Sequence, residues 1–274
     1  MSEQRIDVDA IDLAAWDRAG FLHVSGFLQE AQLDNLRQSV DAISACRNGE
    51  HEVMQHYEMT DGGVRICRSE HLIEGFELLR ALLTDGPMGV MAGTLLGGDA
   101  LLYKEKINYK LAGGAGFAPH QDAPAYPFVD THVTCMLAID DATIDNGCVE
   151  VVAGMHAEVL PMDDRGCIVP SLVGSMRWTP MPIRSGDLLW FHSKCPHRSK
   201  PNLTSQDRRA LFCTYNLAAA GNLRDRYYET KLAQFAQPDE SDRVRVSLIG
   251  DFEGRPPTRD ELEQHFAAVR KNDE

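Results

Sequence analysis

The fold is decided by the region around the stretch Ala118-Pro119-His120-Gln121-Asp122. From Ala100 onward the chain consists of short apolar or alternating runs separated by Gly, Pro, Asn and Asp. Short strands at such spacing are typical of a sandwich or barrel. We therefore predict a mainly β fold, a double-stranded β-helix (jelly roll, cupin-like) with flanking helices. The predicted strands cover residues 101–110, 131–139, 148–152, 187–192 and 209–215.

Helices are predicted on both sides of this β region. Residues 30–45 carry apolar side chains at helical spacing, and a second helix is expected over 87–96, with Asp85 as its N-cap and Gly97 at its end. A capping box at Thr258 indicates a C-terminal helix. We expect one domain over 1–274, in which the helical N-terminal third buttresses a barrel core from about 100 to 220 and a helical extension follows.

Composition excludes several classes of partner. The formal charge of −14 disfavours nucleic acid and anionic membranes, both of which would be repelled. No apolar stretch approaches the roughly 20 residues that span a bilayer, and the N-terminus lacks a signal-like start, so a cytoplasmic protein is expected. Seven cysteines without close repeated spacing argue against a disulfide framework. The sequence leaves the oligomeric state open.

Three residues are candidates for a metal centre. On an extended strand, side chains at i and i+2 share a face, so His120 and Asp122 can hold one ion together. A distant third ligand is offered by His197, within Cys195-Pro196-His197-Arg198-Ser199. Two imidazoles and one carboxylate form the facial ligand set of non-haem Fe(II) oxygenases. Arg208, eleven residues beyond His197, is suited to bind the far carboxylate of a 2-oxo acid through both arms of its guanidinium.

These motifs, with Gly113, Gly114 and Gly116 before them, resemble the phytanoyl-CoA dioxygenase superfamily of Fe(II)- and 2-oxoglutarate-dependent oxygenases. The resemblance runs from Gly20 to about Tyr228. It implies that His120, Asp122 and His197 are iron ligands and that O2 is consumed. It also implies that Arg208 and Ser199 hold the C5 carboxylate of 2-oxoglutarate.

A narrower resemblance lies in Tyr103–Lys110, Gly114–Tyr126 and Arg208–Asn216, which are similar to bacterial organophosphonate hydroxylases. It implies hydroxylation of the carbon next to phosphorus in a small organophosphonate, with 2-(trimethylammonio)ethylphosphonate or 2-aminoethylphosphonate favoured. Asn108 would then touch 2-oxoglutarate and Lys106 the phosphonate.

Aromatic and basic residues are candidates for the surroundings of the substrate. Tyr126 and Arg209 are further candidate substrate contacts, because an ammonium group needs an aromatic surface and an anion needs local cations. Lys104 and Lys110 share the strand face of Lys106, but we interpret them as solvated. Further candidate cations for a basic cluster are Arg224 and Arg226. The other aromatic residues, expected mainly in the core, are Trp178, Trp190, Tyr215, Tyr227 and Tyr228.

Alternatives remain open at this stage. His192 competes with His197 as the distal ligand, although its context favours it less. His51 and His56 lie five apart, roughly 140° around a helix, and so are not expected to chelate together. The same triad would suit a zinc hydrolase or isomerase. Other possibilities are a superfamily hydroxylase that acts on another small acid, an acyl-CoA or an amino-acid derivative, and a non-catalytic jelly-roll binding protein.

Overall fold

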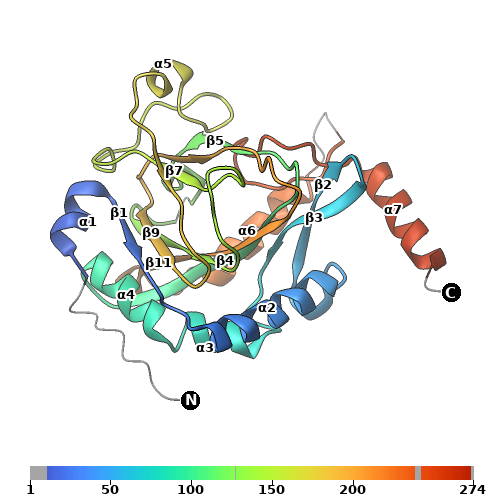
Figure 1. Ribbon diagram of the computed structural model, residues 1–274, viewed down its shortest axis with the longest axis horizontal. Helices are drawn as coiled ribbons and strands as arrows, with labels where there is room; N and C mark the ends of the chain where they lie inside the picture. Colours follow the sequence, from blue (N-terminus) through green and yellow to red (C-terminus); the bar gives the residue numbers. More distant parts are fainter. Residues whose placement is uncertain (1–10, 127, 238–241, 273–274) are drawn as a thin grey trace.

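The computed structural model describes residues 11–126, 128–237 and 242–272. Two antiparallel sheets form a jelly roll, with most helices gathered against the larger sheet (Figure 1). The larger sheet has seven strands in the order β1-β9-β6-β11-β4-β3-β2. These are β1 (Phe21–Val24), β9 (Leu188–His192), β6 (His132–Ala138), β11 (Arg208–Leu217), β4 (Ala100–Lys110), β3 (Gly63–Glu70) and β2 (Met54–Thr60).

The smaller sheet has the order β5-β10-β7-β8. Its strands are β5 (Phe117–His120), β10 (His197–Ser199), β7 (Val149–Val151) and β8 (Thr179–Met181). β10 pairs with β5 on one side and β7 on the other, with His197 opposite both His120 and Val151. The strand pairing therefore brings together two histidines that lie far apart in the sequence.

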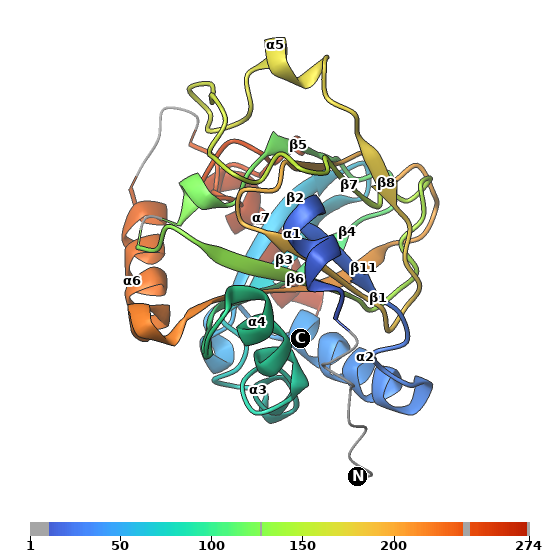
Figure 2. The same cartoon turned by 90° about the vertical axis from the view of Figure 1, so that its left-hand side faces the viewer.

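Helices cover the outer face of the larger sheet (Figure 2). Those in the N-terminal part are α1 (Leu13–Ala19), α2 (Glu30–Ala45), α3 (Glu77–Leu83) and α4 (Pro87–Leu96). Later come α5 (Pro170–Val173), α6 (Arg224–Phe235) and α7 (Arg259–Asn272), with short 3-10 turns η2 (Glu50–Glu52), η3 (Ala123–Ala125) and η4 (Ala218–Ala220). The apolar stripe of α2, with Leu33, Val40 and Ile43, packs in one core with the sheet. This packing fixes which sheet face turns inward.

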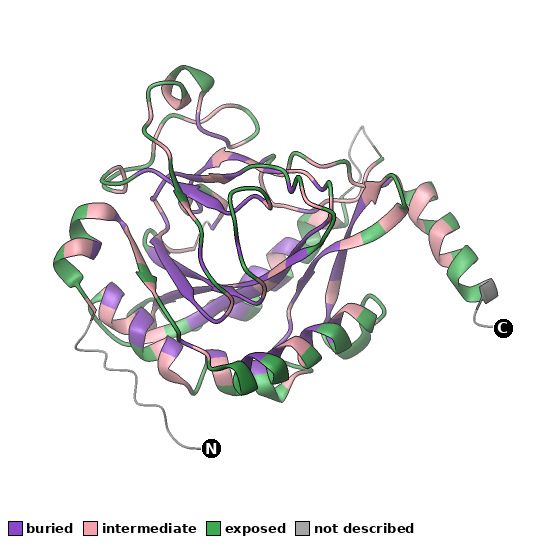
Figure 3. Ribbon diagram, viewed as in Figure 1, coloured by how far each residue is buried: buried purple, intermediate pink, exposed green. Residues whose placement is uncertain are grey.

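Strand β4 shows which side chains face the helices and which face the barrel interior. Ile107 and Tyr109 lie in the core under the helices, so the alternate residues Lys106, Asn108 and Lys110 face the barrel interior. The buried strands form the centre of the molecule, and exposure is concentrated on the outer helix faces and loops (Figure 3). A row of polar side chains thus lies inside an otherwise apolar sandwich.

The predicted jelly roll is confirmed, and so are the five predicted strands and the helices over 30–45, 87–96 and the C-terminal segment. The proposed cap at Asp85 is wrong, because Gly86 occupies the N-cap of α4, whereas Gly97 ends that helix in the left-handed conformation as expected. The β2–β3 hairpin was not predicted, although Asp61-Gly62-Gly63 is a hairpin turn signal. Among the described residues, no helix is long and apolar enough to cross a membrane.

Candidate active site

The side chains of His120, Asp122 and His197 meet in the barrel interior. All three are buried, and one ligand atom from each lies within 4.8 Å of the others. Nδ1 of His120 is 2.7 Å from the Ala118 carbonyl oxygen, and Nδ1 of His197 is 3.0 Å from that of Cys195. A carbonyl oxygen only accepts, so each Nδ1 carries the proton and each Nε2 presents a lone pair. Burial lowers the pKa of His197 to about 4, which keeps its ring neutral.

Asp122 reaches the site by a different route from the one expected. β5 ends at His120, and Asp122 takes a helical conformation (φ −70°, ψ −31°) as the residue before η3. The strand alternation invoked from the sequence therefore does not extend to Asp122. Its position is held by Thr134, whose hydroxyl donates to Oδ2 at 3.0 Å. Burial raises the pKa of this carboxyl, but His197 and the nearby cations outweigh burial and hold it below its ordinary value.

A cavity leads from this triad along β4 to Arg208. Asn108, Phe212 and Ser199 line both this space and the triad's own surroundings. Arg208 is buried, and no carboxylate of the described residues lies within salt-bridge distance of it. Its Nη2 donates to the Gly147 carbonyl at 3.0 Å, while Nε has no partner. A buried guanidinium without an acidic partner is costly and marks a place for an anionic ligand.

Lys110 completes this distal end of the cavity, which we define as Lys110, Ser199 and Arg208. The interpretation of Lys110 as a solvated residue is wrong: it is buried, because β4 turns this face inward. Its Nζ donates to Ser199 Oγ at 2.7 Å, to Gly147 at 3.3 Å and to the Lys200 carbonyl. Ser199 Oγ accepts this bond, so its own proton is free to point toward a ligand. Burial, and then Arg208, lower the pKa of Lys110 to about 7.

Gly147 is required at this end. Its φ is +71°, a conformation that disfavours other residues, and a Cβ there would lie 2.2 Å from the Lys200 carbonyl and 2.8 Å from Lys110 Nζ. The tight turn lets one carbonyl accept from both Lys110 and Arg208. The two cations are thus fixed around a single backbone oxygen.

The proximal end, beside the triad, consists of Lys104, Lys106, Tyr126 and Tyr227. Lys104 was interpreted as solvated, and this too is wrong, since it is buried on the same inward face. Neither lysine ammonium has a hydrogen-bond or ion-pair acceptor within the described ranges. Lys104 Nζ lies 4.3 Å from the ring centroid of Tyr126, and Lys106 Nζ lies 5.6 Å from that of Phe212. Burial lowers the pKa of both lysines, and that of Lys106 falls far below its ordinary value.

The sequence did not reveal a buried charge network next to the proximal end. Glu70, on β3, is bonded to Lys231 of α6 and lies 3.4 Å from Arg68 Nη1. Arg68 Nε also donates to Asn108 Oδ1 at 2.9 Å. Arg68, Glu70 and Lys231 lie in no recognisable motif, and the unrecognised β2–β3 hairpin could have pointed only to Arg68 and Glu70. Both oxygens of Glu70 thus already contact cations of the protein.

Asp251 is a second site residue that the sequence did not indicate. It is buried, and its Oδ2 lies 3.5 Å from His120 Nε2, while its Oδ1 has no hydrogen-bond partner in the described part of the chain. The segment that carries it bonds to β5, because the Ala118 amide donates to the Asp251 carbonyl at 2.7 Å. Its position 131 residues after His120, outside any motif, gave no signal.

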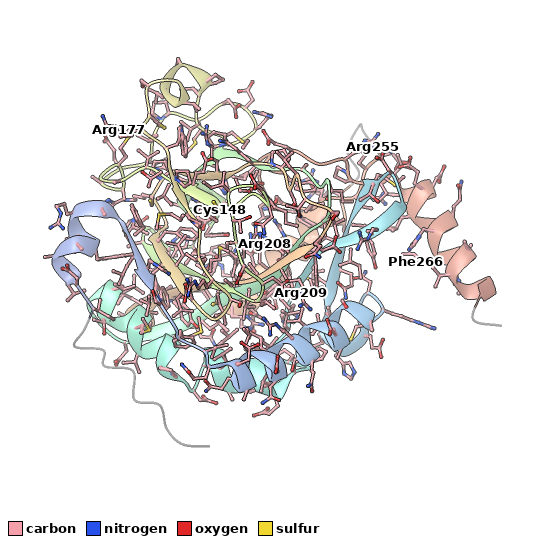
Figure 4. The ribbon with its side chains drawn as sticks, viewed as in Figure 1. Cys148, Arg177, Arg208, Arg209, Arg255 and Phe266 are labelled. Atoms are coloured by element: carbon pink, nitrogen blue, oxygen red, sulfur yellow. The ribbon has the colours of Figure 1, made fainter. Side chains whose placement is uncertain are left out.

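Arg209 is not part of the site, which corrects its assignment as a substrate contact. Successive residues of β11 point to opposite faces, so Arg208 turns inward and Arg209 outward (Figure 4). Arg209 pairs with Asp140 at 2.8 Å and with Asp41 of α2 at 2.7 Å. Arg224 is likewise engaged elsewhere, in a buried pair with Glu105.

The other candidate histidines, His192, His51 and His56, lie apart from the triad. His192 contacts His156 and Trp16 by its ring, and His51 lies in η2 while His56 lies in β2, so the helix assumed for this pair does not form. Tyr126 does line the site, with its hydroxyl 3.4 Å from Asp122 Oδ1. Of the candidate aromatic residues, Trp190 and Tyr215 are fully buried in the core as expected.

Comparison with known proteins agrees with this geometry. The phytanoyl-CoA dioxygenase family model matches residues 16–210. The chain belongs to the phytanoyl-CoA dioxygenase family. It is 44% identical over 247 residues to a methylphosphonate hydroxylase of Gimesia maris, covering 89% of this chain and 95% of that protein. It is 34% identical to a 2-aminoethylphosphonate dioxygenase of an uncultured bacterium, covering 84% and 88%.

Among solved structures, the epimerase SnoN in complex with Fe3+, α-ketoglutarate and nogalamycin RO shares the fold. The TM-score is 0.65 at 20% identity, over 91% of this chain and 95% of that one. With the family established, the chain is an Fe(II)- and 2-oxoglutarate-dependent dioxygenase that uses O2, as the sequence resemblance implied. The alternatives of a zinc hydrolase and of a non-catalytic binding protein are not supported.

Proposed function

We propose that this dioxygenase hydroxylates a small organophosphonate at the carbon bonded to phosphorus. The observation that carries the proposal is the ammonium group of Lys106, which lines the same cavity as His120 and Asp122 and has no acceptor within the described part of the chain. A phosphonate dianion would supply that acceptor. The names of the relatives from Gimesia maris and the uncultured bacterium support the same class of substrate.

The donor set fits Fe(II). His120 and His197 each present Nε2 with the opposite nitrogen fixed on a carbonyl, and Asp122 adds one carboxylate, so the three would hold the ion and leave a face open. When bound, Fe(II) would activate O2, with 2-oxoglutarate as the co-reductant that becomes succinate and CO2, and one oxygen atom of O2 would convert a C–H bond of the substrate to C–OH. Thr134 keeps Asp122 oriented for this role.

The distal end would hold the far carboxylate of 2-oxoglutarate. Arg208 provides a charged fork, Ser199 a hydroxyl whose oxygen is already occupied by Lys110, and Asn108 an amide midway along the cavity. Because the two ends lie apart along the cavity, the far carboxylate of 2-oxoglutarate and the phosphonate of the substrate would bind at separate places. One cation set binds the cosubstrate and another the substrate.

The experiment is a panel of phosphonates and matched carboxylic acids, scored for substrate-dependent succinate formation and for new phosphorus NMR signals. We expect succinate and an α-hydroxyphosphonate to form in equal amounts. The panel includes 2-aminoethylphosphonate and 2-(trimethylammonio)ethylphosphonate, the two substrates expected from the sequence, together with methylphosphonate. Turnover of a carboxylic acid or acyl-CoA without any phosphorus-bearing product would contradict the proposal.

A further inference from the structure

The proximal end contains an aromatic surface of the kind that binds ammonium groups. The rings of Tyr126 and Tyr227 meet edge to face with centroids 5.8 Å apart, and both are buried. Both line the cavity that also contains His120 and Asp122. Such a pair of electron-rich faces beside a metal centre would suit a substrate with a quaternary ammonium group.

The ammonium group of Lys104 already lies against this aromatic surface. Lys104 Nζ lies 4.3 Å from the Tyr126 centroid and 6.0 Å from that of Tyr227. The residue is buried, and its ammonium group has no hydrogen-bond or ion-pair acceptor in the described ranges. The charges of Asp122, Glu70 and Asp251 also stabilise this cation, from beyond ion-pair distance. Its position is fixed by the strand, because Lys104 lies opposite Thr214 in the pairing of β4 with β11. A substrate ammonium would have to displace this side chain or share the surface with a like charge.

We propose that Lys104 is the residue that determines substrate specificity, and that it makes the enzyme prefer alkylphosphonates without a charged nitrogen. The inference rests on the proposed phosphonate hydroxylation and narrows its substrate. Lys106 remains free to bind the phosphonate, while Lys104 closes the aromatic surface to cations and adds a positive field that repels them.

The carboxylates beside this surface already act on cations of the protein, Lys104 included. Glu70 is engaged by Lys231 and Arg68. Asp122 belongs to the triad. Of these three carboxylates, Asp251 has an oxygen without a hydrogen-bond partner among the described residues, but its other oxygen faces His120 at 3.5 Å, so a cation placed there would lie against the metal centre. The local arrangement thus favours a neutral substituent on the substrate carbon.

Two pairs of phosphonates that differ only in charge provide the test. In one pair, 2-aminoethylphosphonate is compared with n-propylphosphonate, and in the other 2-(trimethylammonio)ethylphosphonate with 3,3-dimethylbutylphosphonate. Binding of each is measured anaerobically by calorimetry with Fe(II) and 2-oxoglutarate present, and kcat/KM is measured for those that turn over. For the wild-type enzyme we expect the neutral member of each pair to bind roughly tenfold more tightly or better.

The variant Lys104→Met removes the charge and keeps the length. In this variant the ratio of the dissociation constants within each pair should come close to one. The affinity for the quaternary ammonium compound should increase most, because the tyrosine faces become available. Arg226→Met is the matched control. Arg226 lies on α6, next to Tyr227, and its guanidinium is 4.0 Å from the ring centroid of Phe128, but the residue is exposed and does not line the cavity. This control should keep the wild-type ratios.

Equal or tighter binding of either cationic member by the wild-type enzyme would overturn the proposal, as would unchanged ratios in Lys104→Met. The wild-type comparison needs no variant, so it decides the matter even if Lys104→Met fails to fold. Absence of binding and turnover for every phosphonate, methylphosphonate included, would instead refute the proposed function itself.

Discussion

The two ends of the cavity are both basic, but they hold their cations differently. At the distal end, Lys110 donates to three oxygens and Arg208 is fixed on Gly147. At the proximal end, Lys104 and Lys106 have only aromatic faces as close partners among the described residues. The difference is in keeping with the proposal that the distal end is preorganised for one dicarboxylate, whereas the proximal end would have its charges satisfied by the substrate.

The metal centre between the two ends should be the most sensitive point. His120→Ala, Asp122→Ala or His197→Ala should each abolish turnover, because three ligands are the minimum that orients the open face. Activity and iron content are measured on protein that circular dichroism shows to be folded. His192→Ala is the matched control, with near-normal iron binding expected. Wild-type activity in any triad variant would refute the centre.

Removal of the distal guanidinium should have the next largest effect. Arg208→Ala should weaken 2-oxoglutarate binding by about 2 to 5 kcal/mol, roughly thirty- to several-thousand-fold, since a charge-assisted pair loses one partner. Half-saturating 2-oxoglutarate concentrations provide the measurement. Arg209→Ala, on the outer face of the same strand, should leave that concentration nearly unchanged. If Arg209→Ala raised the half-saturating 2-oxoglutarate concentration more than Arg208→Ala did, the inward face would be assigned to the wrong residue.

A smaller effect is expected from pH at the distal end. The pKa of Lys110 is about 7, lowered first by burial and then by Arg208, with Cys148, Glu253 and Glu58 opposing. Below that pH the ammonium is already present, whereas above it the dianion must draw a proton onto Lys110. The 2-oxoglutarate affinity should therefore fall as pH rises from 7, by at most about tenfold per unit. Lys110→Met should bind more weakly and lose this dependence, and a flat wild-type profile from pH 6.5 to 8.5 would contradict it.

Much of this arrangement could be predicted because it depends on local pattern. His-x-Asp and the distal His–Arg spacing identify four inward-facing residues, and short alternating strands indicate the jelly roll. The errors concern facts that local pattern does not contain. The two-residue repeat of a strand predicts that Lys104, Lys106 and Lys110 share one face of β4. Only the packing of helices α2 to α4 against the opposite face shows that this lysine face is turned to the barrel interior.

Residues contributed by distant segments could not be found in this way. Arg68 and Lys231 enter through the unpredicted hairpin and α6, and Asp251 through a C-terminal segment with no motif. The error at Arg209 was avoidable, because the alternation of side chains along a strand, counted from the inward-facing Arg208, already places Arg209 on the outer face. Charge complementarity across the barrel is a property of the assembled sheets, so it appears only when they are paired.

The central claim is that the two ends bind different anions, and one crossed measurement tests it. Dissociation constants for 2-oxoglutarate and for the best phosphonate substrate are determined for Lys106→Met and Arg208→Ala. We expect Lys106→Met to weaken phosphonate binding at least about tenfold with little change for 2-oxoglutarate, and Arg208→Ala to do the reverse. Equal losses of both ligands in both variants, or a loss of 2-oxoglutarate alone in Lys106→Met, would contradict the account.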